Sequence, residues 1–224
     1  MSAIEHHYVR GIRCHGDVQY RLAGPAERWN DLHLAQSAID AACGLLSLLM
    51  AAAILKGLPR SSLIRITRAE RGPLRALWER ASEDIFEGTT HRDLSDYVGA
   101  AFTDLQCEVL ISSSGTRIGA AAAAAIAAGH MPILRFDTRS WDHFSTVVGF
   151  ESTDDEAGPR ALLLLDPSHP APWLVPFNAR LDLSSKTNES VRAKRPYTLP
   201  YRYLGGEAWA VKLRSLVIVR AQPP

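Results

Sequence analysis

The sequence has few cysteines, and their spacing argues against a covalent framework. Its 224 residues include three cysteines, Cys14, Cys43 and Cys107, and no two of them form a Cys-x-x-Cys pair. Small secreted domains that depend on disulfides carry many more, so a reducing compartment is the natural home of this chain. The paired ligands of a structural zinc site are also missing, and we expect neither a metal nor another cofactor.

The sequence also lacks a surplus of charge. It has 25 Lys and Arg residues against 24 Asp and Glu residues, for a formal net charge of +1. A dedicated nucleic-acid-binding domain is strongly basic, so we expect no nucleic-acid partner. Basic residues do alternate with tyrosines between Lys186 and Tyr203, but such a run is more often a solvated loop than a nucleic-acid surface.

No segment of the sequence is suited to membrane insertion or to signal-dependent secretion. The N-terminus has no apolar signal core, and the longest apolar run, residues 43–55, is shorter than the roughly 20 residues that span a bilayer. We therefore expect a cytoplasmic protein, with export by a signal-independent route as an open alternative. The abundance of alanine and arginine suggests a bacterial source, while nothing indicates the oligomeric state.

What the sequence does contain is the pattern of a globular α+β domain. Residues 1–30 predict an extended arm, and residues 31–130 a mainly helical lobe in which the apolar pattern becomes helical from Leu32 onward. Residues 131–224 predict a mainly β lobe, because apolar strand-like runs alternate there with polar turns. Helices followed by strands in this order predict a single domain of residues 1–224, with the helical lobe packed against an antiparallel sheet.

Three short segments combine residue types that carry nucleophilic chemistry. Gln36 lies seven positions before Cys43, which together with Gly44 begins the apolar run. His143 begins an apolar strand, and Asp166 ends the next one, 23 positions later. A hairpin of this length would place the histidine and the aspartate side by side on neighbouring strands.

This combination has a chemical reason. A cysteine attacks as its thiolate, and the positive end of a helix that begins at Cys43 favours that form. His143 can then serve as the base, and Asp166 can hold its imidazole in the required orientation. The side-chain amide of Gln36 and the backbone N–H of Cys43 are candidates to stabilise the oxyanion that forms on the attacked carbonyl.

The same segments resemble those of papain-like cysteine peptidases, and more closely the leader-processing peptidase domains of bacteriocin exporters, the double-glycine peptidases. In that family a glutamine precedes a Cys-Gly helix start, a strand begins His-x-x-x-Val-Val-Gly, and Asp-Pro follows an apolar strand. The matching positions here, within residues 33–168, are Gln36, Cys43-Gly44, His143 through Gly149, and Asp166-Pro167. The resemblance implies a papain-like fold, in which a helical lobe packs against an antiparallel β-sheet and the site lies in the cleft.

The sequence departs from that family in three respects. Gln36 lies one position further from the cysteine than is usual, and residues 60–105 form a helix-rich insert, predicted as two or three helices. In addition, no transmembrane exporter segment follows. A double-glycine leader is therefore not the expected substrate.

Each of these residues also has a simpler interpretation. Cys43 alone could be a buried core thiol, His143 a surface residue, Asp166 a turn residue and Gln36 an exposed helix residue. Their occurrence together favours a cysteine peptidase that hydrolyses a peptide or isopeptide bond in a protein or peptide substrate. The alternatives are acyl transfer or deamidation, as in transglutaminase-like enzymes, and a catalytically inactive binding module on the same fold.

Overall fold

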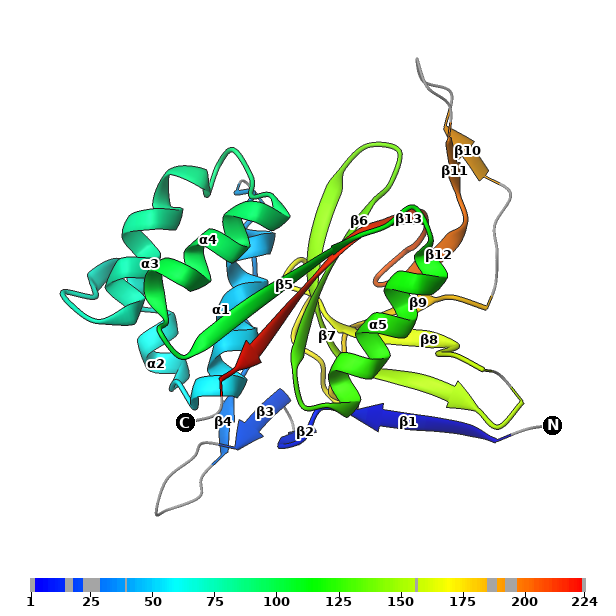
Figure 1. The fold of residues 1–224 in the computed structure, drawn as a ribbon, viewed down its shortest axis with the longest axis horizontal. Coiled ribbons are helices and arrows are strands. Elements are labelled where there is room, and N and C mark those ends of the chain that lie inside the picture. Colours follow the sequence, from blue (N-terminus) through cyan, green and yellow to red (C-terminus); the bar gives the residue numbers. More distant parts are fainter. Residues whose placement is uncertain are drawn as a thin grey trace.

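Helices and strands occupy different sides of the molecule. In Figure 1 the helices α1 to α4 lie together on one side, and most strands lie on the other. The computed structural model of the protein describes residues 3–14, 18–21, 29–38, 40–155, 157–184, 189–191 and 197–222. The basic run considered above falls largely outside these ranges, with Lys186, Arg192, Lys194 and Arg195, so its interpretation stays a prediction.

Six antiparallel strands close into a barrel. Each is hydrogen-bonded to the next in the order β7-β6-β13-β12-β9-β8, and β8 pairs again with β7. Closure leaves no open end to this ring of strands, which removes the usual exposed edges of a sheet. The six strands are β6 (Met131–Asp137), β7 (Asp142–Thr153), β8 (Ala161–Leu165), β9 (Ala179–Asp182), β12 (Tyr201–Leu204) and β13 (Ala208–Ala221).

Two further strands extend the barrel wall. Strand β1 (Ile4–Tyr8) pairs with the second half of β7, and β5 (Leu105–Ile111) pairs with the second half of β13. The other described strands form a three-stranded sheet and a two-stranded ribbon. These are β2 (Ile12–Cys14), β3 (Val18–Arg21) and β4 (Trp29–Asp31) in the sheet, and β10 (Glu189–Val191) and β11 (Tyr197–Leu199) in the ribbon.

Helices α1 and α5 each pack on several strands of the barrel. Helix α1 (Cys43–Lys56) is apolar on all sides and is correspondingly buried, lying against β7. Helix α5 (Gly115–Ala127) is rich in alanine, and its small side chains let it pack closely on β13, β7 and β6. The remaining helical elements are α2 (Arg60–Leu63), η1 (Ile66–Arg68), α3 (Pro73–Ala81), η2 (Ser82–Asp84) and α4 (His91–Ala101).

The predicted α+β class with an antiparallel sheet is confirmed. The strands expected from the apolar runs of the second half are present as β6, β7, β8 and β13. None of the helices in the described ranges has the length and apolar character needed to cross a membrane.

The helical pattern predicted from Leu32 onward is wrong for residues 32–42, because α1 begins only at Cys43. Leu32 and Leu34 are apolar because they are buried in the core, not because they share a helix face. The backbone N–H of Gln36 donates to the carbonyl of Pro167 (2.7 Å), and that of Ala41 donates to Ile85 (2.7 Å). These donors bind distant segments, so they do not form the bonds of a helix.

Candidate active site

Cys43 is the first residue of α1, at the helix end where backbone N–H groups lack intrahelical partners. The turn before the helix is closed by Asp40, whose carboxylate accepts hydrogen bonds from the backbone N–H groups of Ser37 (3.0 Å) and Ala42 (3.1 Å). No acidic residue occurs in the first turn of α1. The partial positive charge of the helix end therefore acts on the thiol without opposition from a carboxylate in that turn.

Gly44 is required by the packing around this helix start. A Cβ atom at position 44 would collide with the hydroxyl oxygen of Thr89 and lie 3.4 Å from the ring of Phe144. Thr89 comes from the segment before α4, and Phe144 follows His143 on β7. The absent side chain thus allows the helix start that carries Cys43 to fit between two elements that line the same site.

His143 and Asp166 form a buried pair behind the thiol. The imidazole Nε2 lies 2.9 Å from both carboxylate oxygens of Asp166, and the two residues are 6% and 0% exposed. Burial by itself would lower the pKa of His143. The charge of Asp166, the hydrogen bond to it and the Cys43 side chain outweigh burial and raise that pKa to about 10. The imidazole is therefore positively charged at neutral pH.

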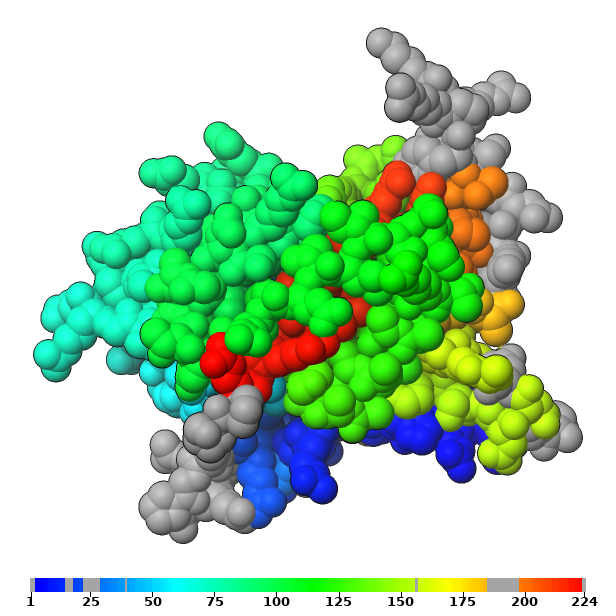
Figure 2. All heavy atoms as spheres, in the orientation of Figure 1, coloured from blue at the N-terminus to red at the C-terminus, as the bar shows by residue number. Residues whose placement is uncertain are grey.

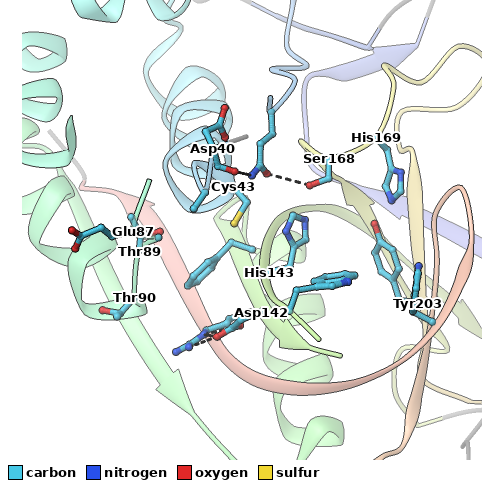
Figure 3. Close-up of a pocket in the computed structure, with 17 residues that line it drawn as sticks. Asp40, Cys43, Glu87, Thr89, Thr90, Asp142, His143, Ser168, His169 and Tyr203 are labelled. Atoms are coloured by element: carbon cyan, nitrogen blue, oxygen red, sulfur yellow. Dashed lines mark hydrogen bonds and ion pairs between the residues drawn. The ribbon is translucent and has the colours of Figure 1, made fainter. Parts of the chain in front are cut away.

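The geometry assigns the two nitrogens of the ring to different partners. Nε2 is engaged by the carboxylate of Asp166, which leaves Nδ1 as the ring nitrogen available to the Cys43 side chain. Figure 3 shows Cys43 and His143 side by side, from the start of α1 and from β7. This order of thiol, imidazole and carboxylate is the one that nucleophilic catalysis requires.

Asp166 stays ionised because its oxygens have several donors. Burial would raise its pKa, but His143, the backbone N–H of Ser168 (2.8 Å) and the hydroxyl of Tyr203 (2.8 Å) together hold the pKa below its usual value. The backbone of Asp166 is held as well. Its N–H donates to the side chain of Asn178 (2.6 Å), and its carbonyl lies 3.0 Å from the ring of His33. These hydrogen bonds thus hold the Asp166 carboxylate in one position and keep it ionised.

Gln36 joins the segment before Cys43 to the segment after Asp166. Its side-chain N–H donates to the carbonyl of Asp40 (2.7 Å), and its side-chain oxygen accepts a hydrogen bond from the hydroxyl of Ser168 (3.2 Å). Gln36 also lines the cavity that contains Cys43. Because an amide nitrogen has two hydrogens, the bond to Asp40 leaves one N–H for a bound ligand.

These side chains meet at a cavity of about 590 Å³. Glu87, Thr89 and Thr90 lie on one side of Cys43, and His169 and Tyr203 lie on the side of His143 (Figure 3). The complete lining is Gln36, Asp40, Ala41, Cys43, Glu87, Gly88, Thr89, Thr90, Arg135, Trp141, Asp142, His143, Phe144, Ser168, His169, Tyr203 and Trp209. The cavity therefore extends in two directions from the thiol.

Two tryptophans form an exposed aromatic wall on the histidine side. The ring of Trp141 lies edge-on to His143, with centroids 5.4 Å apart, and Trp209 lies 6.3 Å beyond Trp141. They are 37% and 41% exposed, which is unusual for such large apolar side chains. Exposed aromatic surface beside a cavity is typical of a binding site.

Cys14 and Cys107 form no disulfide among the described residues and lie in different surroundings. The thiol of Cys14 donates to the carbonyl of Trp173 (3.0 Å), and burial raises the pKa of Cys107 to about 12. Among the described residues, no group of three or more His, Cys, Asp or Glu side chains is arranged to hold a metal ion.

The structure brings together the four residues that the sequence suggested. Cys43, His143 and Gln36 line one cavity, and Asp166 lies directly behind His143. The sequence patterns did not reveal Tyr203, which they placed only within a basic and aromatic run. The alternation in YRYL could have placed Tyr201 and Tyr203 on one buried face of a strand, but not next to Asp166.

Comparisons with known proteins yield little. No protein-family model matches the sequence, and no curated protein matches it significantly. Among solved structures, UfSP from C. elegans is similar, with a TM-score of 0.48 and 16% sequence identity, over 100% of this chain and 35% of UfSP. The chain thus spans about a third of the length of that protein. A likeness at this score and identity supports no conclusion about chemistry.

Proposed function

We propose that this protein is a papain-like cysteine peptidase that hydrolyses a peptide or isopeptide bond in a protein or peptide substrate. Cys43 is the nucleophile, His143 the general acid and base, and Asp166 the carboxylate that orients His143. The observation that carries the proposal is the buried His143–Asp166 pair, which lies against a cysteine at the first position of a helix. A cysteine that only fills space in the core does not require a buried, charged imidazole beside it.

The residues define each step of the reaction. The Cys43 thiolate attacks the substrate carbonyl carbon, and the oxyanion is stabilised by the backbone N–H of Cys43 and the remaining amide N–H of Gln36. His143 donates its proton to the leaving nitrogen, and the C–N bond breaks to give a thioester and an amine. Neutral His143 then takes a proton from water, which attacks the thioester and releases the acid and the thiol.

The proton transfer also fixes the direction in which the substrate lies. The leaving nitrogen must be within reach of His143, so the amine portion extends toward Trp141 and Trp209. The acyl portion extends in the opposite direction, past Glu87 and Thr89. A cavity that is open on both sides of the nucleophile suits a chain that continues beyond both ends of the cleaved bond.

A first experiment tests activation of the thiol. Iodoacetamide labelling followed by mass spectrometry near neutral pH should modify Cys43 faster than Cys14 or Cys107, and His143→Gln should abolish the difference. Cys107 is the slow reference, since burial raises its pKa to about 12. Equal rates for the three thiols would leave Cys43 without special reactivity and would contradict the proposal.

A second experiment separates hydrolysis from its alternatives. Cys43→Ala should retain a partner protein from a lysate uncleaved, while the wild-type protein should release it with a lower mass. Cys14→Ala is the matched control, because it also removes one thiol but should cleave like the wild type. A gain in partner mass that matches a joined amine would assign acyl transfer. An unchanged partner held equally by all three proteins would assign a binding module.

A further inference from the structure

A second cavity lies on the helical side of the molecule, around α2, η1 and the start of α3. Its volume is about 580 Å³, and it shares no lining residue with the candidate active site. In Figures 1 and 2 this segment is the cyan part at the left edge, away from the barrel. The lining consists of Leu58, Ser61, Ser62, Arg65, Arg68, Ala69, Arg71, Pro73 and Leu74.

Three arginines dominate this lining, and their spacing follows from the local backbone. Arg65, Arg68 and Arg71 are three residues apart, and η1 (Ile66–Arg68) is a 3₁₀-helix. Three residues complete one turn of such a helix, so the side chains of Arg65 and Arg68 project on the same side. Ile66 is buried on the other side, which anchors the turn and leaves the arginines exposed.

The charges of these arginines are not neutralised by the protein. The guanidinium groups of Arg65, Arg68 and Arg71 form no hydrogen bond or ion pair with another described residue, and no carboxylate lines the cavity. Arginines on the barrel side are paired with acids instead: Arg135 with Asp142, Arg180 with Glu151, and Arg214 with Asp137. This cavity thus brings together three guanidinium groups whose charges no described carboxylate balances.

The basic residues of the chain are concentrated in the segment that contains this cavity. Residues 56–80 contain seven basic and two acidic residues, whereas the rest of the chain contains 18 basic and 22 acidic residues. A chain of net charge +1 thus has one segment of net charge +5 and a remainder of −4. The positive potential of this segment attracts anions.

The remaining lining residues indicate which class of anion the cavity suits. Ser61 and Ser62 add hydroxyl groups that can donate to oxygen atoms, while Leu58 and Leu74 provide an apolar wall. Guanidinium groups bind phosphate oxygens in a two-pronged manner, so three of them suit several phosphate groups better than one carboxylate. A cavity of this volume has the size of a small-molecule site and not of a long groove.

We propose that this cavity binds a small anion with two or more phosphate groups, held by Arg65, Arg68 and Arg71. The site is independent of the proposed peptidase activity. It is also partly preformed, because the backbone N–H of Arg68 donates to the carbonyl of Arg65 (2.8 Å) and that of Ala69 donates to Ile66 (3.1 Å).

The test is titration calorimetry of the full chain with sodium tripolyphosphate and, separately, with inositol hexakisphosphate. We expect one site per chain, weaker binding as salt concentration rises, and much weaker binding of orthophosphate. Loss of one charged hydrogen-bond donor in Arg68→Gln should weaken binding about tenfold or more, and Arg65→Gln should do the same. Melting curves of both variants should match the wild type, because these side chains are exposed.

The control is Arg75→Gln, which removes the same charge from the neighbouring helix. The Arg75 guanidinium is already paired with Glu79 and does not line the cavity, so this variant should bind like the wild type. Absence of binding at millimolar tripolyphosphate would overturn the proposal, as would an equal loss in Arg75→Gln. Binding only to vesicles that contain phosphatidylinositol bisphosphate, or only to duplex DNA, would overturn it in favour of a lipid or nucleic-acid surface.

Discussion

The hydroxyl of Tyr203 offers a sharp test of how the buried carboxylate is stabilised. It donates a 2.8 Å hydrogen bond to Asp166, whose side chain is completely buried. Tyr203→Phe removes this one donor and keeps the ring, which packs against Phe136 at 5.0 Å and His169 at 5.8 Å. The variant therefore isolates a hydrogen bond to a charge, with little loss of packing.

The expected magnitude follows from the charge of the acceptor. A hydrogen bond to an ionised group contributes about 1.5–3 kcal/mol, whereas one between neutral groups contributes about 0.5–1.5 kcal/mol. For a chain of this size, the loss in Tyr203→Phe corresponds to a fall in melting temperature of about 3–12 °C. In an Asp166→Asn background the acceptor is neutral, so the same substitution should cost about 1 kcal/mol less.

The assay is urea unfolding of the four proteins of this double-mutant cycle at neutral pH. Tyr201→Phe serves as the control, because Tyr201 lies two residues away on β12 and its hydroxyl has no hydrogen-bond partner among the described residues. That variant should differ from the wild type by less than about 0.5 kcal/mol. If Tyr203→Phe costs the same with Asp166 and with Asn at position 166, the hydroxyl does not stabilise a charge and the reasoning fails.

Three further predictions concern the helix start, the oxyanion site and the charged pair. Gly44→Ala should destabilise the protein by about 1–3 kcal/mol through overlap with Thr89, and Thr89→Ala should restore most of the melting temperature. Gln36→Ala should lower the turnover of an identified substrate about a hundredfold, and also lower the melting temperature because the hydrogen bonds to Asp40 and Ser168 are lost; full activity would exclude the amide from the oxyanion site. The pKa of His143 is raised, so its stabilising contribution is complete below about pH 6.5 and is lost as the pH rises through about 10. The pKa of Asp166 is lowered, so its contribution to stability is present at pH values above the ordinary pKa of an aspartate and is lost in acid. Asp166→Asn should therefore reduce the change in unfolding free energy with pH on both the acidic and the alkaline side.

Local patterns carried much of the fold prediction. The apolar runs at residues 131–137 and 143–151 became β6 and β7, because buried strands and polar turns leave a clear mark in the sequence. Closure of the barrel, in contrast, cannot be recognised from any local sequence pattern. It depends on pairing of β12 with β9 and of β9 with β8, and these short strands carry too little pattern to reveal their neighbours.

The site was predictable to the extent that its residues occur at the ends of elements. Cys43 at a helix start and Asp166 at a strand end can be recognised from the residues next to them in the chain. The role of Tyr203 cannot be recognised from neighbouring residues, because it arises only when β12 pairs with β13 and β9 in the barrel. The two hydrogen bonds of Gln36 are likewise a product of the tertiary structure, since one of them reaches Ser168.

Strand β13 has a consequence for how the protein is made. It pairs with β12, β6 and β5 in succession along residues 208–221, and Cys43, His143 and Asp166 all precede it in the chain. On the ribosome, the barrel cannot close until the residues of β13 have left the exit tunnel. We expect the nascent chain to carry an exposed thiol without an assembled base, so reactivity at Cys43 should arise only after this strand has been translated.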